Sequence, residues 1–213
     1  MKKISALVLA AGESKRLAGQ NKLLLPFGGK TIIECTVDAL LQADIDEVIV
    51  VLGHAAEAVR KALGERPIRA VYNPNYPKGM ASSIQAGLAA LSPTSQAVMI
   101  FLADLPLIQP AELNHLIAAH AQAKGKTITV PAFRGQRGNP VIFDLCYRAE
   151  LLALQGDIGG KSILASHPQA VLEVEMSTAS ILEDIDTLEA YKRLLSPQND
   201  HLKTRLDFSK KVI

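Results

Sequence analysis

A loop near the N-terminus combines small residues with cations directly after an apolar run. The run covers residues 4–11 and predicts a strand buried on both faces, and the loop behind it contains Gly12, Ser14, Arg16 and Lys22. Small residues let backbone N–H groups approach an anion closely, and Arg and Lys add charge-assisted hydrogen bonds. The loop could also be a solvent-exposed connector, but the coincidence of these features favours the binding of a polyphosphate.

A second polar stretch, residues 73–83, lies between a predicted strand and a predicted helix. Its Gly79 and Ser83 would then lie at a helix N-terminus, at the carboxyl edge of a sheet, where open α/β sheets bind their ligands. The alternative is structural: the prolines and Gly79 form turns, and Ser82 or Ser83 caps the helix. These residue types alone leave both interpretations open.

Two acidic residues are candidates for metal binding. Asp104 ends the apolar run 97–103, where a carboxylate is costly to hold without a partner. Mg²⁺ would satisfy it, because this ion prefers one or two carboxylates together with phosphate oxygens and water. Asp104 could instead cap the turn before Pro106. Asp186 is the second acidic residue, at the start of a predicted helix for which it would be the N-cap.

Predicted strands and helices alternate along the chain. Strands are predicted at residues 4–11, 47–52, 68–72, 97–103, 127–132 and 141–143, and helices at 30–43, 54–63, 81–91, from 111 and at 187–195. Strands that are apolar throughout and alternate with helices predict an α/β fold, a mostly parallel twisted sheet with helices on both faces. We expect one domain over residues 1–195 and an extension of unknown role at 196–213. Glu112, His115 and His120 lie on the helix from residue 111 and are expected at its surface.

The composition argues against several classes of protein. A chain of 213 residues with 48% hydrophobic content suits one sizeable domain, and its formal net charge of +2 with dispersed cations disfavours a nucleic-acid partner. Cys35 and Cys146 show no metal-ligand spacing. The apolar run behind the N-terminal Met-Lys-Lys is too short for a signal peptide and no run is long enough to span a membrane, so we expect a cytoplasmic protein.

Residues 9–22 resemble a family signature, Leu-x-Ala-Gly-x-Ser-x-Arg-Met-Gly followed by Lys. This signature belongs to nucleotidyltransferases with the sugar-nucleotidyltransferase-like fold, and the chain is most similar to the molybdenum cofactor cytidylyltransferase branch, the MobA-like NTP transferases. Leu17 and Ala18 depart from the usual Met and Gly. The stretch around Gly79 and Ser83 also resembles the loop that helps to hold the nucleotide base in this branch. The nucleotide-binding residues that the resemblance implies are Leu9, Ala10, Ala11, Gly12, Ser14, Arg16, Lys22, Gly79, Ser83 and Asp104.

Further matches lie in the second half of the chain. Asp104 falls on the family's metal-binding Asp-x-Pro, and Asp186 on the Asp before Thr that is a second metal ligand in related cytidylyltransferases. Asn139 stands where the family usually has the His of Gly-His-Pro, and Asn cannot titrate near neutrality as His does. Asp157 falls in a segment that looks like the family's Gly-Asp-x-Gly-x-Arg. The resemblance implies a role for Asn139 and Asp157 in acceptor binding.

The resemblance implies an Mg²⁺-dependent nucleotidyltransferase. A phosphate on a small acceptor of the molybdopterin type would attack the α-phosphorus of CTP and release pyrophosphate, with Arg16, Lys22 and Asp104 as catalytic residues. The sequence at Ala10, Ala11 and Gly12 favours the cytidylyl branch over the guanylyl branch. Two enzyme alternatives remain, guanylylation of the same cofactor and nucleotidyl transfer to a sugar phosphate. A third is a non-catalytic nucleotide-binding protein that delivers cofactor to a molybdoenzyme partner.

Overall fold

The apolar runs form the centre of a large sheet. The computed structural model describes residues 2–15, 17 and 20–195. Within this part of the chain, the sheet has eight strands in the order β10 (Val171–Glu175), β7 (Ile128–Phe133), β9 (Val141–Asp144), β6 (Ala97–Leu102), β1 (Ile4–Ala10), β4 (Glu47–Leu52) and β5 (Arg69–Tyr72), with β8 (Gln136–Arg137) paired to β7. Strands β1, β4 and β6 are buried along almost their whole length, as expected for strands covered on both faces.

The sheet is mostly parallel, as predicted. Strands β6, β1, β4 and β5 run parallel, and β10 runs parallel to β7. The exceptions are β9, which pairs antiparallel with both β6 and β7, and the short β8, which pairs antiparallel with β7. Only a short segment containing β8 joins β7 to β9, and strands joined by so short a connection pair antiparallel. The edge strand β5 is less buried than predicted, since Arg69, Ala70 and Tyr72 are exposed.

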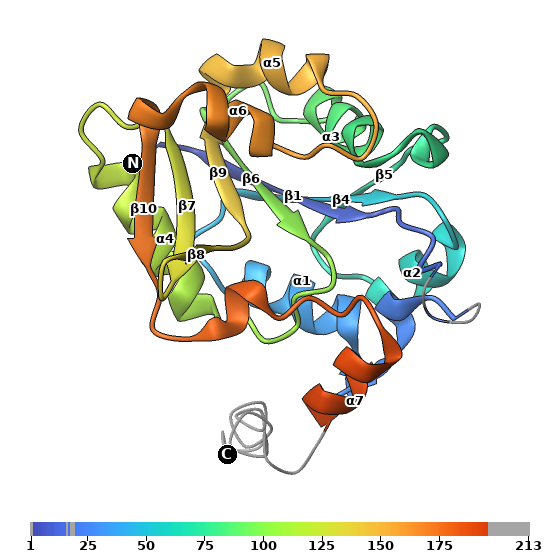
Figure 1. The fold of residues 1–213 in the computed structure, drawn as a ribbon. Helices are drawn as coiled ribbons and strands as arrows, with labels where there is room; N and C mark the ends of the chain where they lie inside the picture. The colour runs from blue at the N-terminus through green and yellow to red at the C-terminus, as the bar shows by residue number, and fades with distance from the viewer. Residues whose placement is uncertain (1, 16, 18–19, 196–213) are drawn as a thin grey trace, which may run out of the picture.

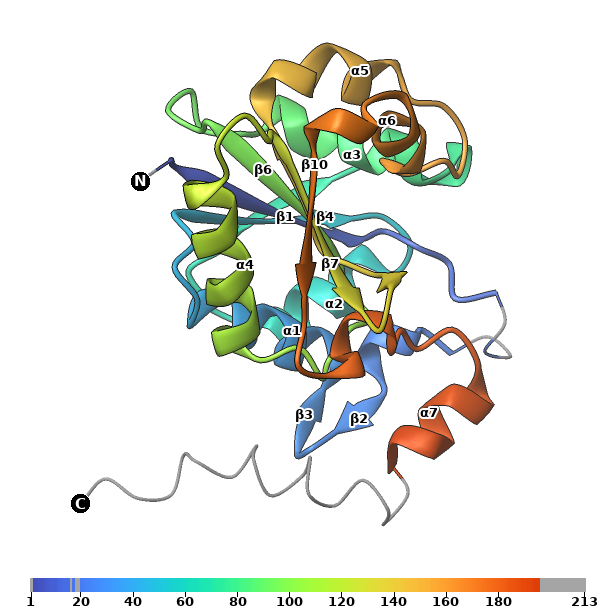
Figure 2. The same ribbon diagram turned by 60° about the vertical axis from the view of Figure 1, so that its left-hand side comes forward.

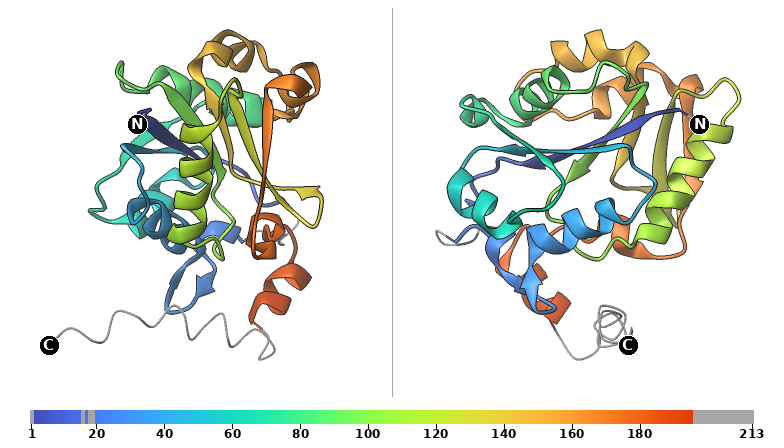
Figure 3. Two further views of the ribbon diagram at one scale, coloured as in Figure 1. Left: turned by 90° about the vertical axis from the view of Figure 1, so that its left-hand side faces the viewer. Right: turned by 180° about the vertical axis from the view of Figure 1, so that it is seen from behind.

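Helices cover both faces of the sheet, which confirms the predicted layers (Figure 1). The helices are α1 (Ile32–Leu41), α2 (Ala56–Leu63), α3 (Met80–Ala89), α4 (Pro110–Gln122), α5 (Arg148–Ala153), α6 (Lys161–Ser166) and α7 (Leu188–Leu195). Short 3-10 helices lie at Lys22–Leu24, Tyr76–Lys78, Leu145–Tyr147, Pro168–Ala170 and Ala179–Leu182. Helices α1, α2 and α4 lie on one face, and α3, α5 and α6 lie on the other (Figure 3).

The alternation of side chains along β1 shows how the two core layers arise. Ala6 and Val8 pack in the cluster that α1, α2 and α4 cover, whereas Leu7 packs in the cluster beneath α3, α5 and α6. Gly87 of α3 lies so close to Leu7 that an added Cβ would be 1.9 Å from a methyl carbon of that leucine. The close approach holds α3 against the sheet, and α3 begins at the carboxyl end of the central strands.

The predicted helix at 30–43 begins later than expected. Lys30–Thr31 forms β3, which pairs with β2 (Pro26–Phe27) in a small hairpin (Figure 2). Gly28 and Gly29 form its turn with φ of 58° and 82°, a conformation that glycine adopts without strain. The Glu34 carboxylate accepts hydrogen bonds from the backbone N–H and the hydroxyl of Thr31, so α1 starts at Ile32 behind a capped turn.

His120 is not at the surface, and this expectation was wrong. Its side chain is buried at 1% exposure, with Nδ1 2.8 Å from the Thr129 hydroxyl and Nε2 3.1 Å from Asp144 Oδ1. The Lys2 ammonium also donates to Asp144. Apolar periodicity shows which face of a helix is buried but not that a histidine on this face finds polar partners on β7 and β9. His115 is exposed, as expected.

Acid should weaken the fold through His120. Burial lowers its pKa from the ordinary value of 6.5, and the nearby Asp144 only partly offsets this effect. His120 therefore binds a proton more weakly in the folded state than in the unfolded chain. The free energy of unfolding falls as the pH drops through about 6.5. We expect His120→Gln to reduce the loss of unfolding free energy between pH 7 and pH 5, measured by urea denaturation at each pH. Identical pH slopes for the variant and the parent would contradict this prediction.

Candidate active site

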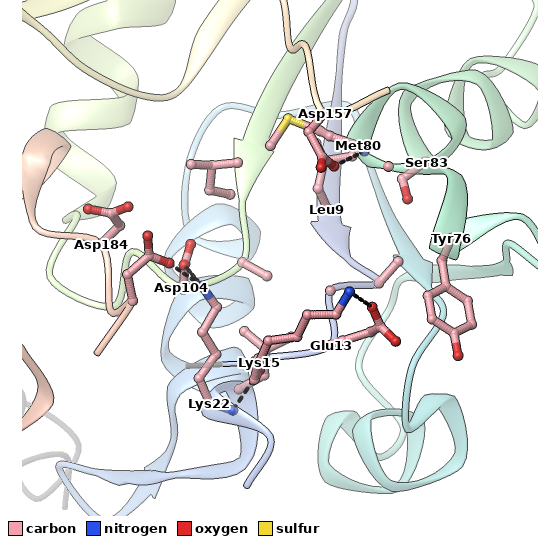
Figure 4. Close-up of a pocket in the computed structure, with 18 of the residues that line it drawn as sticks. Leu9, Glu13, Lys15, Lys22, Tyr76, Met80, Ser83, Asp104, Asp157 and Asp184 are labelled. Atoms are coloured by element: carbon pink, nitrogen blue, oxygen red, sulfur yellow. Dashed lines mark hydrogen bonds and ion pairs between the residues drawn. The ribbon is translucent and has the colours of Figure 1, made fainter. Parts of the chain in front are cut away.

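Segments from five parts of the chain line one cleft of about 550 Å³ at the carboxyl ends of β1 and β6. Figure 4 shows the residues around this cleft. It is lined by Leu9, Ala11, Gly12, Glu13, Ser14, Lys15, Lys22, Leu23, Tyr76, Pro77, Gly79, Met80, Ser83, Leu102, Ala103, Asp104, Asp157, Asp184 and Asp186. Residues from all three polar stretches that were singled out in the sequence thus share one cavity.

The loop after β1 closes on itself at Lys22. The Ser14 hydroxyl accepts a hydrogen bond of 3.1 Å from the Lys22 backbone N–H, which ties the two ends of the loop together. Ser14 has a φ of 53°, in the left-handed region, so the loop turns sharply at this residue. Ala10 is not a lining residue, because its side chain packs in the core. Arg16 lies outside the described residues, and its assignment to the triphosphate stays a prediction.

Three carboxylates converge at the other side of the cleft. Oxygens of Asp104, Asp184 and Asp186 all lie within 4.8 Å of one another. Asp104 follows β6, and its backbone oxygen accepts a hydrogen bond of 3.2 Å from Ile185 N. The Ile185 side chain is fully buried, and both of its aspartate neighbours line the cleft. Sequence reasoning paired Asp104 with Asp186 and took Asp184, the first residue of the same Asp-x-Asp, as a weaker candidate.

Thr187, not Asp186, caps α7. The Thr187 hydroxyl accepts a hydrogen bond of 3.1 Å from the Ala190 N–H, and its backbone oxygen accepts from Tyr191 N. The expectation that Asp186 is the N-cap was therefore wrong. A role of Asp186 in the site is favoured by its position, because it lines the cleft.

The Lys22 ammonium lies among these carboxylates. Its Nζ donates to Asp104 Oδ2 in a short hydrogen bond and to Asp186 Oδ1 at 2.8 Å (Figure 4 shows the pair with Asp104). Burial alone would lower the pKa of Lys22, but the charges and hydrogen bonds of the two aspartates outweigh it and raise that pKa. Burial and the charges of Asp104 and Asp186 raise the pKa of the Asp184 carboxyl. Three carboxylates thus lie close together, and the Lys22 ammonium binds two of them.

The donor set fits a hard divalent cation. Carboxylate oxygens are the ligands that Mg²⁺ prefers, and three of them lie close enough to share one ion. The charge of the cleft also favours a cation, because among the described lining residues there are more acidic than basic side chains. The acids are Glu13, Asp104, Asp157, Asp184 and Asp186, and the bases are Lys15 and Lys22. A polyphosphate would meet net repulsion here unless a further cation joined it.

The start of α3 is closed by a distant loop. The Met80 N–H donates to Asp157 Oδ1 at 3.1 Å, and the Ala81 N–H donates to the Gly156 carbonyl at 3.0 Å. Gly79 has a φ of 103°, and a Cβ on it would lie 2.4 Å from the Gly156 carbonyl carbon. These N–H groups therefore bind residues 156–157, and they do not point into the cleft as the sequence led us to expect. Neither Ser82 nor Ser83 is the N-cap, since α3 begins at Met80 after Gly79.

The two residues assigned to acceptor binding are separated. Asp157 lines the cleft, where it also caps α3. Asn139 is not among the lining residues, and its backbone N–H donates to the Ile181 carbonyl at 3.0 Å. Its role in acceptor binding stays a prediction. Sequence reasoning did not select Tyr76 and Met80, which line the cleft beside Gly79.

Comparison with known proteins identifies the family. The model of the MobA-like NTP transferase domain matches residues 6–171. The chain belongs to the MobA-like NTP transferase family. The resemblance found in the loop after β1 is thereby confirmed. The fold agrees, since a nucleotidyl transferase from Methanothermobacter thermautotroptrophicus superposes with a TM-score of 0.81 at 29% identity, over 95% of this chain and 99% of that one.

Two further relatives bear on activity and metal binding. Nicotine blue oxidoreductase of Paenarthrobacter nicotinovorans is 32% identical over 197 residues, which is 90% of this chain and 96% of that protein. Rv0371c from Mycobacterium tuberculosis superposes with a TM-score of 0.81 at 33% identity, over 91% of this chain and 98% of that one. A second structure of Rv0371c is a complex with manganese, with a TM-score of 0.78 at 31% identity over the same shares.

Removing the Lys22 ammonium should strengthen cation binding by the free protein. In Lys22→Met, Asp104 and Asp186 lose the ammonium that binds them, so we expect the affinity for Mn²⁺ in the absence of nucleotide to rise about tenfold. Mn²⁺ binding is measured by electron paramagnetic resonance titration. Lys15→Met is the matched control, because Lys15 pairs with Glu13 at 2.8 Å and is exposed, and its loss should change the affinity much less. An unchanged or lower affinity in Lys22→Met would show that Lys22 does not compete for the cluster.

Proposed function

We propose that this protein transfers CMP from CTP to the phosphate of a small acceptor of the molybdopterin type and releases pyrophosphate. Membership of the MobA-like NTP transferases supports nucleotidyl transfer. The observation that carries the proposal is the meeting, in one cleft, of the loop after β1 with Lys22 and the cluster of Asp104, Asp184 and Asp186. These are the parts that a reaction between two phosphorylated substrates needs.

The chain's own groups would act by position and charge. An oxygen of the acceptor phosphate attacks the α-phosphorus of the nucleotide, and the bond from this phosphorus to the oxygen that bridges it to the β-phosphate breaks. Pyrophosphate carries away the electron pair, so no protein nucleophile is required. The backbone around Gly12 and Ser14 would hold the β- and γ-phosphates, and Lys22 would donate to phosphate oxygens after leaving its aspartate partners. Arg16 would add a second cation to this loop.

The acidic cluster would hold Mg²⁺. We assign Asp104 and Asp186 as its ligands, with Asp184 as a third carboxylate, and the manganese complex of Rv0371c supports a divalent ion in this family. When bound, Mg²⁺ supplies charge neutralisation and Lewis-acid polarisation of phosphate oxygens. Crowding of three carboxylates supports this assignment, because a divalent cation relieves their mutual repulsion better than the single charge of Lys22 does.

The choice of CTP rests on the loop after β1. Ala10, Ala11 and Gly12 resemble the cytidylyl branch, where the guanylyl branch typically has Ala-Gly-Gly. Gly79 and Ser83 line the opposite side of the cleft, where they would meet the base. We further propose a catalytic domain over residues 1–195, a cytoplasmic location, and delivery of the product to a molybdoenzyme. No helix among the described residues is long and apolar enough to cross a membrane.

A second candidate function comes from one relative. Nicotine blue oxidoreductase aligns with nearly the whole chain at 32% identity, so an oxidoreductase activity on nicotine blue is the second candidate. The two candidates predict different products. A nucleotidyltransferase releases pyrophosphate from an NTP, whereas an oxidoreductase consumes a reductant such as NADH or NADPH, which is followed by absorbance at 340 nm.

Pyrophosphate release decides between them. We expect release with CTP, acceptor and Mg²⁺ to exceed release with GTP, and no consumption of NADH or NADPH. Asp104→Asn should lower the rate of release about a hundredfold or more, because it removes one charge that the site needs at the reacting phosphates. Asp44→Asn is the control, since Asp44 is exposed and lies outside the cleft.

Three outcomes would contradict parts of the proposal. Release that is equal or greater with GTP would contradict the cytidylyl assignment. Release by Asp104→Asn at the parent rate would contradict the role of the acidic cluster. Oxidation of NADH or NADPH with nicotine blue, without pyrophosphate release from any NTP, would favour the second candidate.

A further inference from the structure

Asn73 is a buried polar residue to which the proposed mechanism gives no role. It follows β5 and is 2% exposed. Its Oδ1 accepts a hydrogen bond of 2.9 Å from Asn75 N, and its Nδ2 donates to Ser82 Oγ at 2.9 Å and to Ser83 Oγ at 3.1 Å. A backbone N–H can only donate, so the bond from Asn75 fixes which end of the amide is the oxygen. The Nδ2 group must therefore face the two serines.

This orientation decides what each serine hydroxyl can do. Both hydroxyls accept from Asn73, which leaves each with one hydrogen to donate. The Ser82 hydroxyl has two acceptors for its one hydrogen, the carbonyls of Asn75 at 2.8 Å and Gly79 at 2.9 Å. The Ser83 hydroxyl has no acceptor among the described residues, although Ser83 is 4% exposed. A buried hydroxyl normally finds a partner for its hydrogen.

The Ser83 hydroxyl is directed to the cleft. Ser83 is a lining residue, and Figure 4 shows it in the first turn of α3, on the side of the cavity opposite Lys22. The N–H groups of Met80, Ala81 and Ser82 are already bound by Asp157, Gly156 and Gly79. Ser83 O–H is therefore the donor that the first turn of α3 still offers to a ligand.

We propose that Asn73 is a positioning residue that holds Ser83 as a hydrogen-bond donor to an acceptor atom on the base of the bound nucleotide. The inference rests on the proposed function, and it adds the chemical group that the cleft recognises. Cytosine presents O2 and N3 as adjacent acceptors on one edge, and either atom matches a hydroxyl that is already an acceptor toward Asn73. An amino group of the base at this position would donate to the Ser83 oxygen and leave the Ser83 hydrogen without an acceptor. A base with an amino group there would therefore bind less tightly.

Asn73→Asp tests the orientation with little change of shape. The carboxylate offers acceptors where Nδ2 was a donor, so the Ser83 hydroxyl turns to donate to it and presents lone pairs to the cleft. We expect the affinity for CTP in the presence of Mg²⁺, measured by isothermal titration calorimetry, to fall about tenfold. Asn73→Ser removes the amide donors without adding a charge and should lower the affinity less.

The double variant separates orientation from charge. The new carboxylate also repels the triphosphate, but this repulsion remains when Ser83 is replaced by Ala. Asn73→Asp should therefore cost clearly less in the Ser83→Ala background than in the parent. An equal loss in both backgrounds would mean that charge alone acts, and would overturn the inference. Ser82→Ala is the matched control, because the Ser82 hydroxyl donates only to backbone carbonyls, and its affinity for CTP should stay at the parent value.

Ribose 5-triphosphate, which lacks the base, locates the contact. Ser83→Ala should weaken CTP about tenfold and leave the affinity for ribose 5-triphosphate unchanged. CTP affinity at the parent level in Ser83→Ala, or an equal loss for both ligands, would overturn the inference even if Asn73→Asp fails to fold. A parent protein that binds neither ligand would instead overturn the proposed function, so the two failures are distinct.

Discussion

Three carboxylates lie close together at one edge of the sheet, and one ammonium group binds two of them. Asp104, Asp184 and Asp186 would repel one another strongly at their separations, and the Lys22 Nζ binds two of them. The same ammonium is the cation that the resemblance assigns to the triphosphate. Lys22 cannot serve both partners fully at once. A divalent cation that enters the cluster would free Lys22 for the phosphates, so metal binding and nucleotide binding should be coupled.

The fold creates this constraint from segments that are far apart in the sequence. Parallel pairing of β6 with β1 puts Asp104 beside the loop that leads to Lys22, and Ser14 closes this loop at Lys22. The buried Ile185 donates its N–H to the Asp104 carbonyl and so fastens the Asp-x-Asp segment beside the end of β6. The opposite side of the cleft is built by α3, whose first turn is closed by residues 156–157 and whose Ser83 lines the cleft.

Much of this architecture could be predicted from local pattern. Uninterrupted apolar runs indicated the central parallel strands, and the type and spacing of residues 9–22 indicated a loop whose residues line the cleft. The contacts that depend on tertiary packing could not be predicted. Nothing near His120 in the sequence shows that Thr129 and Asp144 lie beside it, and nothing near Gly79 shows that Gly156 fills the space next to it. The sequence also predicts that the Lys22 ammonium binds an anion, but it does not show that Asp104 and Asp186 are its partners.

Titration of the parent protein with CTP, with and without Mn²⁺, tests the charge balance at the acidic cluster most directly. The account predicts that CTP binds at least about tenfold more tightly when Mn²⁺ is present. By linkage, the affinity for Mn²⁺ must then rise by the same factor when CTP is present. Equal CTP affinity in chelator and in Mn²⁺ would contradict the account, because the carboxylates would then neither repel the triphosphate nor share a cation with it.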